Sequence, residues 1–286
     1  MTPFELIEPH SLREAAVLLE PDEASVRPVG GGTAVMLMMK LGVLRPTRLI
    51  SLRSIEKRYS EISIAADGAL QIGAMTTLST LERSPLVQEA APVIAQALRT
   101  LSNVRVRNVA TLGGHLAHAD PHLDLPPVLI ALGAHVKTVD ASGGRTMPLE
   151  TLYTGYFETS LGRGELIAEV IVPRQAPRRA AYLKCTTRSA DDWPALGIAV
   201  VLDTDGSVVR EARVVVSAAT DTPTRLLKTE DVLRGVHVSD KLLREAGDVG
   251  VGEITVQGDA HGSASYKKEL LRVYIGRAVR AALHKP

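Results

Sequence analysis

The segment from Asn108 to Pro127 concentrates the side chains of this sequence that could do chemistry. It holds the pair Gly113-Gly114, the hydroxyl of Thr111, three histidines and two aspartates, and it runs directly into the apolar stretch from Val128 to Leu132. An ordinary surface loop has no need of so many polar groups beside a core segment. The composition therefore predicts a binding or catalytic site.

The histidines and aspartates of this segment carry the donor atoms that zinc and iron use. These donors are His115, His118, Asp120, His122 and Asp124. Their spacing is not that of a helical His-x-x-x-His pair, and Pro121 favours an irregular loop. Histidines in a polar loop more often satisfy backbone groups or contact a ligand. We therefore expect neither a bound metal nor catalytic residues, and a metal-dependent hydrolase stays an alternative.

Thr111 with Gly113-Gly114 offers instead a hydroxyl and closely approachable amides, which suits a phosphate. Gly30-Gly31-Gly32-Thr33 has the same character, between a predicted strand at 26–29 and a predicted helix at 34–41. Glycines allow the tight turn, and the first amides of a helix are unpaired and partly positive. Two such loops would hold the two phosphates of a dinucleotide better than either alone.

The loop at residues 30–33 departs from the commonest phosphate-binding patterns. It lacks the Gly-Lys-Ser/Thr ending of a Walker A loop, and Val35 stands where a third spaced glycine would be. A plain strand-to-helix turn is the alternative interpretation. Further along the chain, Asp124 could accept a hydrogen bond from a sugar or ribityl hydroxyl, as acidic residues do in other dinucleotide sites.

The surrounding sequence predicts an α/β unit first and an α+β layer last. The first unit has strands at 4–7, 26–29 and 48–52 with helices from Leu12 and at 34–41. The middle has strands at 62–64, 70–73, 136–139, 145–147 and 166–172 around a mostly helical stretch at 77–101. The arginine-rich residues 174–179 predict a boundary. The last third has strands at 181–186, 196–202 and 208–217, the last as one or two strands, and helices at 241–246 and 264–283.

Composition narrows the class of protein. The chain has 286 residues, 45% hydrophobic, with a net charge of +1, enough for two or three subdomains. Its interspersed charges argue against nucleic-acid binding, and the sequence has neither a leader pattern nor a membrane span, so we expect a cytoplasmic protein. The single cysteine, Cys185, excludes an internal disulfide and a self-contained iron–sulfur cluster, and we expect it to be a buried thiol. The helix at 264–283 should pack on the core, with Lys267 in its solvated basic face.

The glycine segments together resemble the FAD-binding motifs of the medium subunit of molybdenum hydroxylases. That family includes the carbon monoxide dehydrogenase medium subunit and the flavin domain of xanthine dehydrogenase. The segments that carry the resemblance are 30–33, 107–114 and 124–127, with 164–167, 182–184 and 191–193 following in order, so that it covers essentially the whole chain. It implies an α+β protein with a PCMH-type FAD-binding fold, in which two subdomains, 1–55 and 56–175, clasp FAD and a C-terminal α+β domain, 176–286, follows.

The same resemblance implies which residues bind FAD. Those expected around the pyrophosphate are Gly30, Gly31, Gly32, Thr33, Ala34, Thr111, Gly113, Gly114 and His115. Asp124 would hold a flavin-side hydroxyl, Leu166 and Lys184 would lie near the isoalloxazine, and Trp193 would shield the ring. His115 stands where the family often has Asn or a small polar residue, and Ala34 where it often has Asp or Ser.

The function implied is that of one subunit in an electron-transfer complex. A large subunit with the molybdenum cofactor would oxidise the organic substrate, a small iron–sulfur subunit would relay the electrons, and FAD on this chain would pass them to an external acceptor. Two alternatives stay open. A self-contained FAD-dependent oxidase or dehydrogenase would turn over a small substrate alone, and a non-redox nucleotide-binding assembly module would be colourless.

Overall fold

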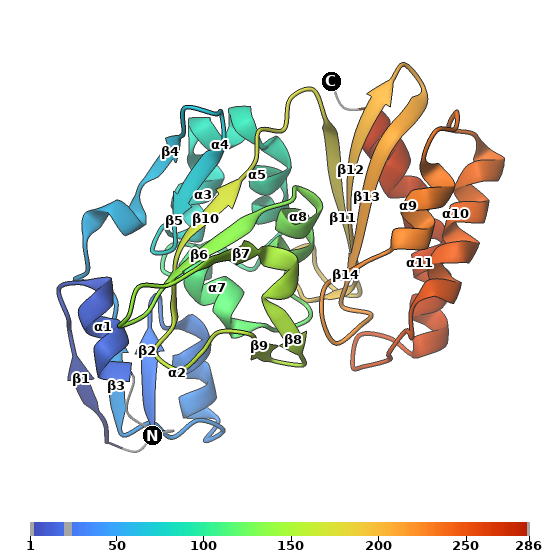
Figure 1. Cartoon of the computed structure of the whole chain (residues 1–286). Helices are drawn as coiled ribbons and strands as arrows, with labels where there is room; N and C mark the ends of the chain where they lie inside the picture. The colour runs from blue at the N-terminus through green and yellow to red at the C-terminus, as the bar shows by residue number, and fades with distance from the viewer. Residues whose placement is uncertain (1–2, 20–24, 285–286) are drawn as a thin grey trace.

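The computed structural model describes residues 3–19 and 25–284. Figure 1 shows the three larger sheets with their helices, following one another along the chain, and the second of these sheets lies between the first and the third. The chain therefore forms a row of three units, and the predicted site segments at 30–33 and 108–127 belong to the first two.

The first sheet is parallel, with strand order β1-β3-β2. Its strands are β1 (Glu5–Ile7), β2 (Val26–Val29) and β3 (Arg48–Ser51), and the crossover helices are α1 (Leu12–Leu19) and α2 (Thr33–Lys40). Parallel neighbours require such crossovers because a tight turn would reverse the chain. Gly42, at φ 74°, follows the end of α2, where a left-handed residue ends the helix. The predicted strand, glycine turn and helix around residues 30–33 are confirmed.

The second sheet is antiparallel, with strand order β4-β5-β10-β6-β7. The strands are β4 (Ile62–Ile64), β5 (Leu70–Gly73), β6 (His135–Val139), β7 (Thr146–Pro148) and β10 (Leu166–Val172). The helices are α3 (Leu78–Arg83), α4 (Pro85–Ala90), α5 (Pro92–Arg99), α6 (Val104–Arg107), α7 (Leu112–His118) and α8 (Leu125–Ala131). Short pieces complete the unit: the 3₁₀ turns Lys57–Ser60 and Leu149–Thr151, and the hairpin β8 (Tyr153–Gly155) with β9 (Glu158–Thr159).

The third sheet is antiparallel, with strand order β11-β12-β13-β14. Its strands are β11 (Arg179–Thr186), β12 (Pro194–Asp205), β13 (Val208–Ser217) and β14 (Thr224–Arg225). Three helices follow: α9 (Leu227–Leu233), α10 (Asp240–Glu253) and α11 (Ala264–Leu283). They cover the face turned away from the second unit (Figure 1). Residues 208–217 form one strand.

Strand β12 joins two cores because its alternating side chains face opposite sides of the sheet. Ala199 and Val201 belong to the core built around α5 and α8, whereas Ile198 and Val200 belong to the core under α10 and α11. The third unit is therefore packed against the second through a continuous apolar interface.

Three local expectations differ from the structure. The Gly113-Gly114 pair lies inside helix α7 rather than in a turn, because Thr111 accepts a hydrogen bond from the amide of Gly114 and so caps the helix. Helix α9 was not predicted from the sequence. Its N-cap is Leu226, which makes no side-chain hydrogen bond, so the sequence carries no capping signal there. Helix α10 runs beyond residue 246 through Gly247, where an added Cβ would lie 2.2 Å from the carbonyl oxygen of Arg272. Close helix packing there overrides the poor helix propensity of glycine.

Helix α11 packs on the core as expected, but Lys267 is not part of its solvated face. The Lys267 side chain is fully buried, and its Nζ donates to the carbonyl oxygen of Ala218 and to Asp259. Burying a lysine ammonium costs free energy unless the charge is paired and hydrogen-bonded, as it is here. Cys185 is a buried free thiol in β11, as predicted. Within the described ranges, no helix has the length and apolar character to cross a membrane.

Candidate functional site

The two glycine segments lie directly against each other. A Cβ on Gly31 would lie 1.9 Å from the carbonyl oxygen of Val109, and one on Gly30 would lie 2.6 Å from Oγ1 of Thr111. Side chains at either position would force the segments apart, so glycine is required there by packing. The structure thus brings together two segments that are nearly eighty residues apart in the sequence.

The first segment presents unpaired amides. Helix α2 begins after Gly32, which adopts the left-handed conformation at φ 75° and gives the helix no side-chain cap. The amide of Met36 is the first to bond back, to the carbonyl oxygen of Gly32. In the described part of the chain, the amides of Thr33, Ala34 and Val35 have no backbone acceptor. These donors and the helix dipole favour an anion at this end of α2.

The second segment uses its amides internally. The amide of Leu112 donates to Thr76, that of Gly113 to the carbonyl oxygen of Ala74, and that of Gly114 to Oγ1 of Thr111. A Cβ on Gly113 would lie 2.7 Å from that of Ala74. This segment therefore supplies a fixed, tightly packed wall, and Gly114 is exposed on it.

His115 is a neutral side chain within this wall. Burial, with a smaller contribution from His118, lowers the pKa of His115 to about 3. Its Nε2 is buried and makes no hydrogen bond to any described residue. A buried ring nitrogen without a hydrogen-bond partner costs free energy. A ligand beside His115 could supply that partner.

Asp124 and Lys184 form a buried pair between the second and third units. Lys184 Nζ lies 3.0 Å from Asp124 Oδ2, and the side chains are 6% and 5% exposed. Tyr182 donates to Asp124 Oδ1 at 2.6 Å, and Lys184 also donates to the carbonyl oxygen of Thr100. Burial raises the pKa of the Asp124 carboxyl, although the Lys184 ammonium opposes this. Strand β11 thus supplies both partners of this carboxylate.

Tyr182 lies in the segment 182–184 that carries part of the family resemblance, but it was not among the residues predicted to bind FAD. It stands two positions before Lys184 on strand β11, and side chains two apart in a strand point to the same face. Burial, followed by the nearby Asp124 carboxylate, raises the pKa of Tyr182 well above its ordinary value. The alternation of side chains along this strand predicts that Tyr182 shares a face with Lys184.

Leu166 lies in another part of the molecule from Lys184. It is buried at the start of β10, in the apolar cluster that includes Leu12 and Ile50 of the first unit. The two residues expected near the isoalloxazine therefore lie in different parts of the fold. Trp193 is 45% exposed, and its ring lies beside that of His122, with 5.3 Å between the ring centres.

The histidine-rich loop after α7 is an ion-pair network. His122 bonds Asp120 through Nδ1 at 3.0 Å and Asp259 through Nε2 at 2.7 Å. His118 packs against the ring of Phe157. Over residues 3–19 and 25–284, no three His, Cys, Asp or Glu side chains converge as metal ligands would. Asp259 lies 137 residues from His122, and no feature of the sequence connects the two.

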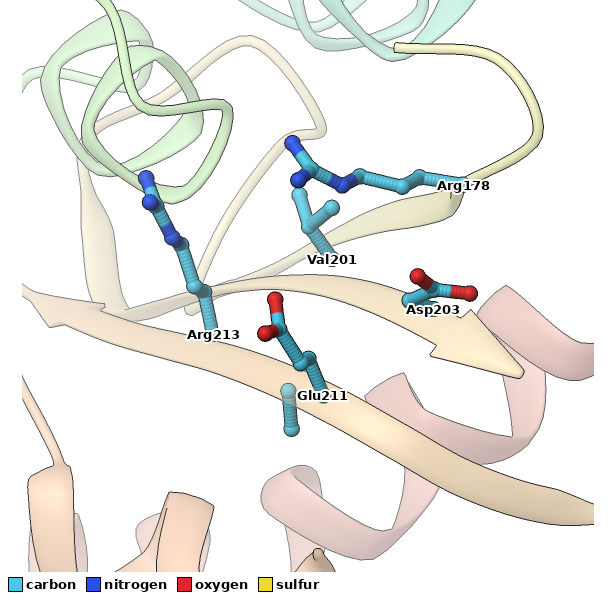
Figure 2. A pocket seen from close by; sticks show the side chains of 6 residues that line it. Arg178, Val201, Asp203, Glu211 and Arg213 are labelled. Atoms are coloured by element: carbon cyan, nitrogen blue, oxygen red, sulfur yellow. The ribbon is translucent and has the colours of Figure 1, made fainter.

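Two depressions lie away from these loops. Figure 2 shows a small pocket on the third sheet in which the guanidinium groups of Arg178 and Arg213 point to the same side of the strands. A larger cavity of about 320 Å³ lies between the start of α5 and the segment that leads into β11. None of the residues predicted to bind the cofactor lines either of them.

Two family models match the chain over nearly its full length. "FAD binding domain in molybdopterin dehydrogenase" matches residues 2–175, and "CO dehydrogenase flavoprotein C-terminal domain" matches residues 181–282. The chain belongs to this flavoprotein family. It is a medium, FAD-binding subunit of the molybdenum hydroxylase type, and its cofactor is FAD.

Individual relatives agree along the whole medium subunit. The nicotine 6-hydroxylase medium subunit of Paenarthrobacter nicotinovorans is 32% identical, over 95% of this chain and 94% of that protein. The carbon monoxide dehydrogenase medium chain of Hydrogenophaga pseudoflava is 30% identical, over 98% and 96%. The solved structure of carbon monoxide dehydrogenase from Hydrogenophaga pseudoflava, which lacks the Mo-pyranopterin moiety, superposes with a TM-score of 0.94 at 32% identity, covering 98% of this chain and 97% of that one. The family resemblance and the predicted α+β fold are thereby confirmed.

The residues of this medium subunit fit the chemistry of FAD. Unpaired amides at the start of α2 suit a pyrophosphate, and the side-chain-free surface of Gly30 and Gly31 lets the second segment close against the first. The buried, unpartnered Nε2 of His115 lies in that second segment. No group in this arrangement conflicts with an anionic dinucleotide.

Proposed function

We propose that this subunit passes electrons from the iron–sulfur clusters of a small partner subunit, through FAD, to an external acceptor. The observation that carries the proposal is the contact between Gly31 and Val109, which places the free amides of α2 beside a second, rigid segment. Bound FAD exchanges electrons singly or in pairs, so it can join one-electron carriers to a two-electron acceptor. A large subunit with the molybdenum cofactor would oxidise the substrate.

For the cofactor itself, we propose different roles for the two segments. Residues 30–34 would bind the pyrophosphate through the unpaired amides of α2. Thr111, Gly113, Gly114 and His115 would shape the opposite wall, since the amides of Gly113, Gly114 and His115 already have acceptors. Asp124, held by Tyr182 and Lys184, would meet a hydroxyl on the flavin side. Leu166 and Trp193 would approach the ring from either side.

The same reasoning supports three functional units. We propose an N-terminal FAD-binding subdomain at 1–55, a middle FAD-binding subdomain at 56–175 and a C-terminal domain at 176–286. The three sheets described above support this division, because each is built from strands of one of these ranges. The C-terminal domain would complete the site through strand β11.

The test is the protein purified from its source with its native partners. We expect flavin and iron–sulfur absorbance together, with about one FAD per copy of this chain, and flavin reduction when the substrate of the large subunit is added without oxygen. Fast reduction of the isolated chain by a small organic substrate would instead indicate a self-contained oxidase or dehydrogenase. A colourless chain that gains no flavin on reconstitution would refute the electron-transfer role.

A further inference from the structure

His122 connects two carboxylates that come from different units of the protein. Its Nδ1 lies 3.0 Å from Oδ1 of Asp120, in the loop after α7, and its Nε2 lies 2.7 Å from Oδ2 of Asp259, in the loop before α11. The side chains of His122 and Asp120 are 10% and 1% exposed. This ring is therefore the polar bridge between the loop that leads to Asp124 and the C-terminal unit.

Both bonds together require a charged ring. Each carboxylate only accepts, and a neutral imidazole carries one N–H, so a neutral His122 would leave one contact without a proton. Burial disfavours the charged ring, but the hydrogen bonds to Asp120 and Asp259 raise the pKa of His122 above its ordinary value of 6.5. The geometry and the charge of the acceptors thus agree on an imidazolium.

The other charged and titratable groups around His122 favour the same state. Burial opposes the ionisation of Asp259, but hydrogen bonds from Lys267 and His122 lower its pKa to about 2. Burial lowers the pKa of His118, although Asp120, which lies 4.0 Å from its Nε2, opposes this. The His261 ring lies 5.3 Å from that of His122. The nearest formal charges are therefore carboxylates, with the Lys267 ammonium behind one of them.

The network closes on itself through the backbone. Lys267 donates to the carbonyl oxygen of Ala218, and the amide of Ala218 donates to the carbonyl oxygen of Pro121, the residue between Asp120 and His122. The loop at 120–122 is thus held by the C-terminal unit from two directions. Asp124 follows two residues later, with its own partners on β11.

We propose that His122 is a positioning residue, which as an imidazolium clamps the loop leading to Asp124 onto the C-terminal unit, and that loss of its proton loosens the grip of this chain on FAD. The second half of this inference rests on the proposed place of Asp124 in the FAD site. Deprotonation removes one of two charge-assisted hydrogen bonds, which are stronger than neutral ones. We call the two hydrogen bonds that His122 makes to Asp120 and Asp259 the clamp.

The only tryptophan of the sequence reports on this proton. Trp193 lies 5.3 Å from the His122 ring, centre to centre, close enough for a cation to interact with the indole face. Because an imidazolium quenches indole emission more than the neutral ring does, the fluorescence of the full chain without FAD should rise as His122 loses its proton. We expect a midpoint above pH 6.5, a lower midpoint in Asp259→Asn, and no transition in His122→Gln.

A matched control separates His122 from its neighbour. The His261 ring lies 5.3 Å from the His122 ring, the same distance as the Trp193 ring, but His261 is not bonded to Asp120. His261→Gln should therefore keep the pH-dependent change in tryptophan fluorescence. A wild-type midpoint at or below pH 6.5, a midpoint unchanged by Asp259→Asn, or a transition that survives in His122→Gln would overturn the clamp.

The effect on the cofactor is measured as the rate of FAD release from the full chain across the same pH range. We expect release to be at least about tenfold faster above the fluorescence midpoint, as for the loss of one charge-assisted hydrogen bond. In His122→Gln, release should be fast at every pH. A wild-type rate without this transition would refute the link to the cofactor. A chain that binds no FAD would refute the proposed function instead, while the tryptophan titration still tests the clamp.

Discussion

Replacing Gly31 with alanine should weaken FAD binding by driving the two glycine segments apart. The new Cβ would lie 1.9 Å from the carbonyl oxygen of Val109, 2.6 Å from its carbonyl carbon and 2.7 Å from Cα of Ala110, and real Cβ contacts below 3.0 Å essentially never occur. All three neighbours are backbone atoms, so no side-chain rotation relieves the clash. The segments must therefore separate by about an ångström.

The size of the effect follows from this displacement. Overpacking of a fixed interior costs about 1–3 kcal/mol, and the cost falls on a contact that positions the free amides of α2. If FAD binding has to restore the original spacing, affinity drops by roughly ten- to a hundredfold, since each 1.4 kcal/mol is a factor of about ten. Flavin fluorescence quenching gives the dissociation constant, and thermal unfolding without FAD gives the stability.

Gly252→Ala is the matched control. Gly252 is an exposed residue of α10, and a Cβ there meets nothing within 4 Å. The substitution should leave FAD affinity unchanged and raise stability by up to about 1 kcal/mol, as alanine does in helices. If Gly31→Ala binds FAD as tightly as the wild type, the pyrophosphate does not lie at these loops. Loss of stability with unchanged affinity would lead to the same conclusion.

Three further outcomes are expected. Lys184→Met should destabilise the chain by about 3–5 kcal/mol in urea unfolding, because it leaves the buried Asp124 carboxylate without its cation. The double variant with Asp124→Asn should recover part of that lost stability. Gly247→Ala should cost about 1–3 kcal/mol because its Cβ would lie 2.2 Å from the carbonyl oxygen of Arg272; stability equal to that of the wild type would contradict the packing. The raised pKa of His122 means that its contribution to stability is complete below pH 6.5 and is lost as pH rises through the raised value, so the stability difference between the wild type and His122→Gln should shrink with rising pH.

The sequence predicted the elements around the first glycine segment well because local rules determine them. The strand before Gly30 and helix α2 after it follow from hydrophobic pattern and glycine placement, and α1 buries the stripe of Leu12, Ala15 and Ala16 that its period implies. The pairing of segments 30–33 and 108–114 was expected from their shared glycines and hydroxyls and again from the family resemblance, and their contact is seen at Gly31 and Val109.

Features that depend on distant partners could not be predicted in this way. Lys267 looks like a surface lysine on α11, and only the positions of Asp259 and the Ala218 carbonyl explain its burial. Gly113 likewise has the residue type of a turn. The close approach of Ala74, whose Cβ would lie 2.7 Å from an added Cβ, explains why a glycine is needed there. In both positions a contact between distant segments decides the role, and residue type alone does not encode it.

The C-terminal unit is a necessary part of the FAD site if Asp124 binds the cofactor. Both partners of that carboxylate, Tyr182 and Lys184, lie on β11, and the face of β12 that carries Val201 packs into the core of the second unit. A chain cut after residue 175 would expose that apolar core to water and remove both side-chain partners of Asp124. We expect residues 1–175 alone to aggregate or to bind FAD at least about a hundredfold more weakly. Titration of the fragment with FAD decides this, and wild-type affinity would show that Asp124 and its partners on β11 have no role in holding the cofactor.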